Sequence, residues 1–180
     1  MSPVAKSLRQ AAAGGRKCSS VEPEEAPQLK EIYLHPGQTF VTKEPSCISM
    51  ILGSCVGVCL FGRRRKMGGA THYMLPKWDG TGEASSRYGD VALHSLIEQF
   101  QSHGSSLRDI QAMVFGGASM FQAFRAGSGT NVGKRNADMA EEILSQYSIA
   151  IVRKSLGGES GRKLKMRTDI GTVSTVLVGN

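Results

Sequence analysis

Short apolar segments bounded by turn residues fill the first half of the folded chain. Residues 47–52 and 55–61 form two such segments on either side of a Gly-Ser turn, and a third covers 66–75 after the basic turn at 62–65. Segments of this length and composition, punctuated by glycine, are typical of β-strands. We therefore expect three neighbouring strands joined by short turns.

The middle of the chain changes to a helical period. Apolar residues share one helix face in two segments, at Leu93, Leu96, Ile97 and Phe100 and again at Ala140, Ile143, Leu144 and Tyr147. Gly104 ends the first segment, and Asn131 is a suitable N-cap for the second. These signals predict two main helices, with residues 112–115 lying between them and running into Gly116-Gly117.

The chain returns to strand-like segments at 149–153, 164–168 and 172–178. Strands at both ends with two helices inside predict an α/β fold of the α+β kind, in which mixed, largely antiparallel sheets are layered with the helices. Residues 1–29 carry three prolines and no sustained apolar period, which is typical of a disordered tail. We expect a single folded domain over residues 30–180.

Composition narrows the class of protein without naming its partner. The chain has 180 residues, 40% hydrophobic and 21% charged, as in an ordinary globular domain. A net charge of +7 favours an acidic partner, be it nucleic acid, a membrane surface or an acidic protein. The scarcity of aromatics among the basic groups gives little support to nucleic acid, and the uncharged run at 46–62 is too rich in glycine and serine to span a membrane. Four irregularly spaced cysteines and the lack of an apolar leader favour a cytoplasmic protein.

Cys55 and His72 are the first candidates for chemistry. Cys55 follows a Gly-Ser turn, and a hairpin centred between Gly62 and Arg65 places it opposite positions 71–73. A free thiol is only slightly ionised at neutral pH, and an adjacent imidazole would generate the thiolate nucleophile. Taken singly, each residue is more typical of a structural position, because cysteine is among the most buried residue types and a lone histidine is commonly a satisfied core residue.

Neighbouring groups would supply what remains of such a site. A hydroxyl such as that of Ser49, or a backbone carbonyl, would orient the imidazole by a hydrogen bond. The backbone N–H groups of Ser54 and Cys55, exposed by the turn, would hold a developing oxyanion. We therefore treat these two amides as candidate oxyanion donors.

A zinc site built from Cys47, Cys55, Cys59 and His72 is the alternative for these residues. Along an extended strand Cys55 and Cys59 lie about 13 Å apart, whereas tetrahedral ligands must approach to about 2.3 Å from one ion. The spacing disfavours a metal centre. The Gly129–Lys134 segment has the wrong spacing for a phosphate-binding loop, so neither metal nor cofactor is predicted.

Five ordered motifs resemble the CheD family of chemoreceptor glutamine deamidases. They are Leu52-Gly-Ser-Cys-Val56, Gly68-Gly-x-x-His72-x-Met-Leu-Pro76, Arg87-Tyr88, Phe115-Gly-Gly-Ala-Ser-Met-Phe121 and Asn131-Val-Gly-x-Arg-Asn136. The likeness runs from about Ile32 to Val178, and the turns at Gly157-Gly158 and Gly171 fit it as well.

The resemblance implies a cysteine amidohydrolase that converts receptor glutamine side chains to glutamate through a thioester and releases ammonia. It assigns the nucleophile to Cys55, the base to His72 and the third member to Ser49, where the family usually has threonine. It also implies a sandwich fold similar to bacterial deamidating toxins, chemoreceptor cytoplasmic domains as substrate and the chemotaxis phosphatase CheC as a further partner. A transglutaminase using the same site and a non-catalytic chemotaxis adaptor remain alternatives.

Overall fold

A computed structural model describes residues 29–119 and 131–178 of the chain. Within these ranges the chain forms nine β-strands, two α-helices and a short 3₁₀ turn at Leu107–Asp109. The strands are β1 (Lys30–Tyr33), β2 (Gln38–Thr42), β3 (Ser46–Leu52), β4 (Val56–Gly62), β5 (Met67–Tyr73), β6 (Ile110–Gly116), β7 (Ala150–Leu156), β8 (Gly161–Arg167) and β9 (Thr172–Val178). The helices are α1 (Gly89–Ser102) and α2 (Val132–Gln146).

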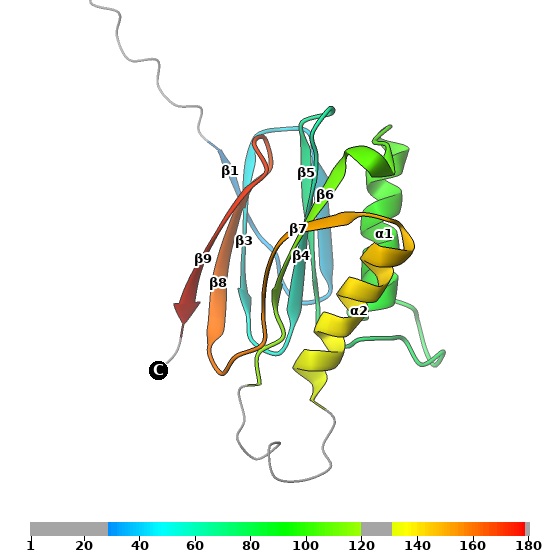
Figure 1. The fold of residues 1–180 in the computed structure, drawn as a ribbon, viewed down its shortest axis with the longest axis vertical. Coiled ribbons are helices and arrows are strands. Elements are labelled where there is room, and N and C mark those ends of the chain that lie inside the picture. The colour runs from blue at the N-terminus through cyan, green and yellow to red at the C-terminus, as the bar shows by residue number, and fades with distance from the viewer. Residues whose placement is uncertain (1–28, 120–130, 179–180) are drawn as a thin grey trace, which may run out of the picture.

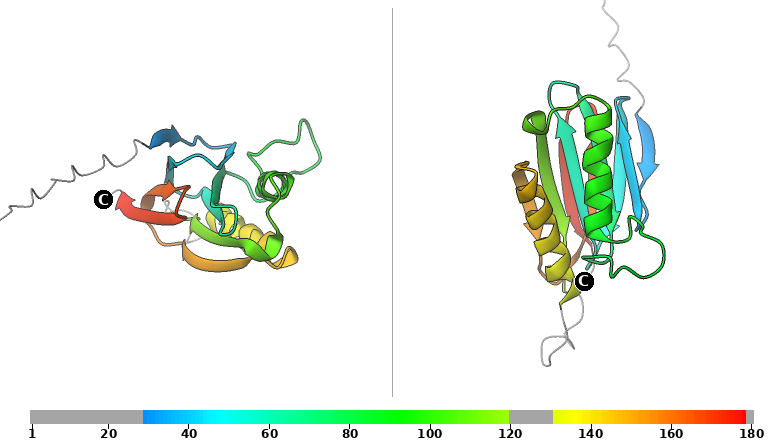
Figure 2. Two further views of the ribbon diagram at one scale, coloured as in Figure 1. Left: turned by 90° about the horizontal axis from the view of Figure 1, so that it is seen from above. Right: turned by 90° about the vertical axis from the view of Figure 1, so that its right-hand side faces the viewer.

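The strands form two sheets that pack face to face, and the helices form a third layer (Figure 1). One sheet has the order β1-β3-β8-β9, and the other has the order β2-β5-β4-β6-β7. Every pairing is antiparallel except β1 with β3 and β6 with β7. Both helices lie on the outer face of the five-stranded sheet, as the side view in Figure 2 shows. The predicted α/β sandwich of largely antiparallel sheets is confirmed.

Two apolar layers hold these parts together, and β4 contributes to both. Val56, Val58 and Leu60 pack towards the helices, whereas Cys59 lies in the layer between the two sheets with Met50 of β3. All five side chains are fully buried. Because β4 is covered on both faces, its sequence is a continuous apolar run instead of an alternation.

Most of the predicted elements are confirmed within a few residues. The two helices occupy the expected segments, and the side chain of Asn131 accepts a hydrogen bond from the Lys134 backbone N–H at 3.0 Å, as expected of an N-cap. The sequence pattern does not reveal β1 and β2, which are short and only partly buried. The predicted tail lies outside the described residues except for Leu29, as do Met120 and Phe121, so the domain boundary stays a prediction.

Among the described residues, no helix combines the length and the apolar character needed to cross a membrane.

Candidate active site

The β4–β5 hairpin brings the segments of Cys55 and His72 together, with a register different from the one predicted. Gly62 pairs with Met67, so that Gly57 is the residue opposite His72. The expected pairing of Cys55 with positions 71–73 is therefore wrong: the four-residue turn lies one residue later, at 63–66, and Cys55 lies in a bend just before β4 begins. The shift from Cys55 to Gly57 is two residues, which preserves the face of the sheet.

Both side chains consequently belong to the layer between the two sheets. Cys55 packs against that layer, and Ala70, two residues before His72 on β5, is one of its buried members. Gly57, which pairs with His72, has no side chain, and its face is covered by the side chains of Met50 and Leu52 of β3.

His72 is almost completely buried and held by one hydrogen bond. Its exposed fraction is 1%, and its Nδ1 lies 3.1 Å from the backbone carbonyl oxygen of Leu34. A carbonyl only accepts, so Nδ1 carries the proton and Nε2 of the neutral ring presents its lone pair. That Nε2 is buried and has no hydrogen-bond partner in the described part of the chain. The ring is therefore fixed in the tautomer of a proton acceptor.

The environment of His72 keeps the ring neutral. Burial lowers the pKa of His72, and this effect outweighs the Leu34 carbonyl, which acts in the opposite direction. The neighbouring His35 lowers the pKa further when it is charged. At neutral pH His72 is a neutral base.

Cys55 is the half-buried member of the three free cysteines in the described residues, whereas Cys47 and Cys59 are buried. Burial raises the pKa of the Cys55 thiol, and its own backbone amide partly opposes this by stabilising the thiolate. Complete burial raises the pKa of Cys59 to about 12, which makes that thiol inert at neutral pH. The resting pair is thus a neutral thiol and a neutral imidazole.

The bend before β4 is held by its carbonyl groups. Gly53 O accepts from Ala118 N–H at 2.8 Å, and Cys55 O accepts from Gly117 N–H at 2.8 Å. Ser54 O accepts from the side-chain amide of Asn136 at 3.0 Å. Within residues 29–119 and 131–178, the Ser54 and Cys55 amides donate no hydrogen bond to another residue. The bend therefore fixes three carbonyls against the protein, while its two amides have no acceptor on any other described residue.

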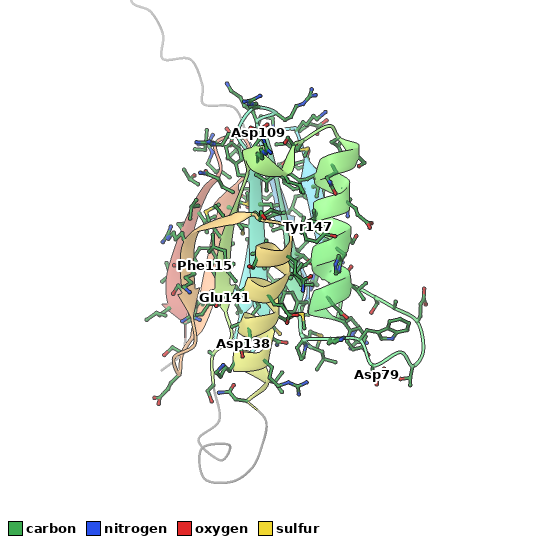
Figure 3. The ribbon with its side chains drawn as sticks, turned by 45° about the vertical axis from the view of Figure 1, so that its right-hand side comes forward. Asp79, Asp109, Phe115, Asp138, Glu141 and Tyr147 are labelled. Carbon is green, nitrogen blue, oxygen red and sulfur yellow. The ribbon has the colours of Figure 1, made fainter. Side chains whose placement is uncertain are left out.

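The Gly116-Gly117 pair makes this arrangement sterically possible. A Cβ on Gly116 would overlap the Cys55 carbonyl oxygen, so only glycine permits the end of β6 to pass so close to the bend. Arg162 holds the same point from the other side: its guanidinium donates to Gly116 O at 2.9 Å and to Gly157 O at 2.7 Å. Phe115, which precedes the glycines, is buried on β6 (Figure 3).

The predicted hydrogen bond between Ser49 and His72 is not formed. The Ser49 hydroxyl donates to Ile32 O at 3.4 Å, and the imidazole is held by Leu34 instead. On β3 the fully buried Ile48 and Met50 face the other sheet, so the alternate residue Ser49 points away from it. The backbone carbonyl of Ser49 does accept from Leu34 N–H at 2.8 Å, which connects Ser49 to the partner of His72 through the main chain.

Comparisons with known proteins agree on one family. The family model described as "CheD chemotactic sensory transduction" matches residues 74–176, more than half of the chain. The chain belongs to the CheD family. It is 43% identical over 146 residues to a probable chemoreceptor glutamine deamidase CheD of Sulfurimonas denitrificans, covering 81% of this chain and 93% of the relative.

Two further CheD relatives are similar over a comparable share of the chain. A probable chemoreceptor glutamine deamidase CheD of Trichlorobacter lovleyi is 40% identical over 145 residues, covering 81% of this chain and 89% of the relative. The chemoreceptor glutamine deamidase CheD of Thermotoga maritima is 31% identical over 144 residues, covering 79% and 89%.

Four residues of this CheD site carry no clear signal of their role in the sequence. Leu34 acts through its backbone carbonyl, a group that any residue type would supply equally well. Gly117, Asn136 and Arg162 position backbone groups around the bend, and only the first two fall within motifs that resemble the family. The Phe-Gly-Gly and Asn131–Asn136 motifs are the signal that pointed to this region, without indicating what the residues contact.

A groove of about 460 Å³ adjoins the bend on the side of α2 and β7. Gly117 lines it, together with two ion pairs, Lys134 with Asp138 and Lys154 with Glu141, each at 2.7 Å. Asp138 and Glu141 project from α2 in Figure 3. The groove thus presents charges of both signs beside the candidate site.

Proposed function

We propose that this chain converts glutamine side chains of chemoreceptors to glutamate by hydrolysis, with Cys55 as nucleophile and His72 as base. The observation that carries the proposal is the buried Nε2 of His72, which has no partner among the described residues and whose tautomer is set by Leu34 O. Cys55 packs against the layer between the sheets, which the His72 strand also faces. Membership of the CheD family, whose relatives are named chemoreceptor glutamine deamidases, supports the choice of substrate.

The reaction begins from the neutral pair. As the Cys55 sulfur attacks the carboxamide carbon, Nε2 of His72 takes the thiol proton, and the carbonyl oxygen becomes an oxyanion. The amides of Ser54 and Cys55, which donate to no other described residue, are the proposed donors to that oxygen, an effect worth about 3–4 kcal/mol for one donor in measured cases.

Two proton transfers complete the cycle. The His72 imidazolium returns its proton to the departing nitrogen, the C–N bond breaks, and ammonia leaves a thioester on Cys55. Water then attacks the thioester, His72 accepts a proton from that water and delivers it to the sulfur, and glutamate is released. Each conversion introduces a carboxylate on the receptor, and the new charge biases its signalling state.

Ser49 has an indirect place in this scheme. Its backbone carbonyl and its hydroxyl both bind the segment that ends in Leu34, the residue whose carbonyl orients His72. We therefore propose that Ser49 supports the imidazole through Leu34. The three cysteines of the described residues are free, which is typical of a reducing compartment, and we propose a cytoplasmic location on that ground. Binding of a CheC-type phosphatase is proposed from family membership, and co-purification of the two proteins would test it.

The proposal is tested by mass spectrometry of receptor peptides incubated with the wild type, Cys55→Ala and His72→Ala. Cys47→Ala is the matched control, because it removes a buried thiol on β3 away from the bend. We expect conversion by the wild type and by the Cys47 variant and none by the other two. Equal conversion by Cys55→Ala would refute the assignment, and preferential incorporation of a labelled amine would indicate a transglutaminase. Receptor binding and signalling that survive alkylation of Cys55 would indicate an adaptor.

A further inference from the structure

Asn136 joins two backbone carbonyls at the open end of the β4–β5 hairpin. It is fully buried in α2, and its Nδ2 donates to Ser54 O at 3.0 Å and to Met74 O at 2.8 Å. Ser54 immediately precedes Cys55, and Met74 follows His72 by two residues. Strand pairing ends at Val56 with Tyr73, and the Asn136 amide links the two chain segments just beyond this last pair.

The chemistry of these two bonds requires a primary amide. Both hydrogens of Nδ2 are used, a carboxylate has none to offer, and a hydroxyl has one. The Oδ1 of Asn136 is buried without a partner in the described residues, which is an unfavourable state for an acceptor. A turned amide would place that oxygen against the Ser54 and Met74 carbonyls. The two donated bonds therefore decide the orientation of the side chain.

The surrounding structure allows α2 to come this close. Gly133 lies in the first turn of α2, and a Cβ there would approach Gly117 O to 2.5 Å and Ala118 O to 2.8 Å. A larger residue would move the helix away from the residues that hold the bend. The Tyr73 hydroxyl, from the strand of His72, donates to the backbone carbonyl of Asn136 at 2.6 Å. Asn136 is thus held by the same hairpin that it clamps.

We infer that Asn136 is a positioning residue that sets the Cys55 bend against the His72 strand. The inference rests on the proposed function, and it adds a residue that touches neither substrate nor reacting atoms. It requires that the loss of both donated bonds changes how effectively His72 assists the Cys55 thiol, in addition to any change in stability. Misplacing reacting groups by about 1 Å costs about a hundredfold in rate, which sets the size of the expected effect.

Three substitutions vary the number of side-chain hydrogen-bond donors at position 136. Asn136→Ala removes both, Asn136→Asp replaces them with acceptors, and Asn136→Ser keeps one in a smaller side chain. Asn131→Ala is the control, since it removes the cap of the same helix without touching either carbonyl. Urea unfolding of each variant records the stability, and the kinetic measurements use the folded fraction.

The first readout needs no receptor. Peptide mass spectrometry follows alkylation of Cys55 by iodoacetamide as a function of pH, which distinguishes this thiol from the buried Cys47 and Cys59. In the wild type and in Asn131→Ala the rate rises with pH as His72 becomes neutral. In Asn136→Ala and Asn136→Asp we expect this step to disappear and the rate to follow an unassisted thiol at higher pH. Asn136→Ser lies between them.

The second readout is receptor deamidation, in which Asn136→Ala lowers kcat by about a hundredfold with little change in KM. A wild-type pH profile of alkylation in both Asn136→Ser and whichever of the other variants folds would overturn the inference. A wild type that alkylates with the His72-dependent step but deamidates no receptor peptide would refute the proposed function alone. The two failures are therefore distinguishable.

Discussion

Replacing Gly117 by alanine perturbs the contact that holds the Cys55 carbonyl. Gly117 has φ +66, and an added Cβ would lie 2.7 Å from Gly133 O, closer than real Cβ contacts come. Gly82 is a matched control with φ +67 and no atom within 4 Å of the added Cβ. The two substitutions share the backbone strain, and only the first adds a collision.

The magnitudes follow from this comparison. A left-handed conformation costs a non-glycine residue about 1–2 kcal/mol, and this cost applies to both variants. Gly117→Ala must also move the first turn of α2 away from the end of β6 by several tenths of an ångström. Overpacking of this kind costs about 1–3 kcal/mol more. We expect Gly117→Ala to be the less stable variant by that second amount.

Urea unfolding measures the stability difference, and alkylation of Cys55 measures its effect on the site. Because Gly117 N–H donates to Cys55 O, the displacement also slows His72-assisted alkylation in Gly117→Ala, while Gly82→Ala keeps the wild-type rate. Unfolding free energies of the two variants that agree within about 0.5 kcal/mol would refute the steric argument. Unchanged alkylation in a destabilised Gly117→Ala would refute its link to the bend.

Four further predictions concern His72, Ser49 and Tyr73. Burial lowers the pKa of His72, so as the pH falls below about 6.5 the unfolded chain binds a proton at this residue that the folded chain does not bind. The wild type should therefore lose stability in this pH range relative to His72→Gln. Urea unfolding at several pH values would measure the difference. His72-assisted alkylation of Cys55 is lost only below that pH, at the lowered pKa, and a midpoint above about 6.5 would contradict the burial argument. Ser49→Ala removes only a long hydrogen bond to the Ile32 carbonyl and should retain most of the deamidase activity. A loss of activity as large as that of His72→Ala would instead indicate that the Ser49 hydroxyl acts directly on the His72 imidazole. Tyr73→Phe removes one buried hydrogen bond and should cost about 1 kcal/mol in unfolding free energy, and an unchanged value would contradict it.

The order of the elements can be predicted from the sequence, but the register of the hairpin cannot. Apolar runs and glycines predict β4 and β5 as neighbours, and a one-step error in register would have moved His72 to the helix side. The turn that sets the register includes Lys66 at φ 47, a left-handed conformation that the presence of a lysine does not predict. The face of His72 is correct because the actual and expected pairings differ by an even number of residues.

The third member of the site shows a different limit of sequence reasoning. A hydroxyl is visible in a sequence, and the resemblance to the CheD family assigns the third member to Ser49. The group that orients His72 is a main-chain carbonyl on Leu34, and carbonyls occur at every position. Likewise, Asn136 in an amphipathic helix is typical of a solvated face, and its burial depends on how α2 docks against the ends of β4 and β5.

The choice of a carbonyl to hold His72 has a chemical consequence. A carboxylate at Nδ1 would favour the imidazolium and with it a standing thiolate, whereas the Leu34 carbonyl fixes the tautomer and leaves burial to lower the pKa of the ring. Burial likewise raises the pKa of Cys55, so charge separation at rest is unfavourable for both groups. In the proposed mechanism the nucleophile therefore forms only when an amide carbonyl reaches the bend and gives the Ser54 and Cys55 amides an oxyanion to stabilise. If the proposed mechanism holds, reactivity depends on the position of the bend, so that the backbone contacts that hold the bend matter as much as the Cys55 and His72 side chains.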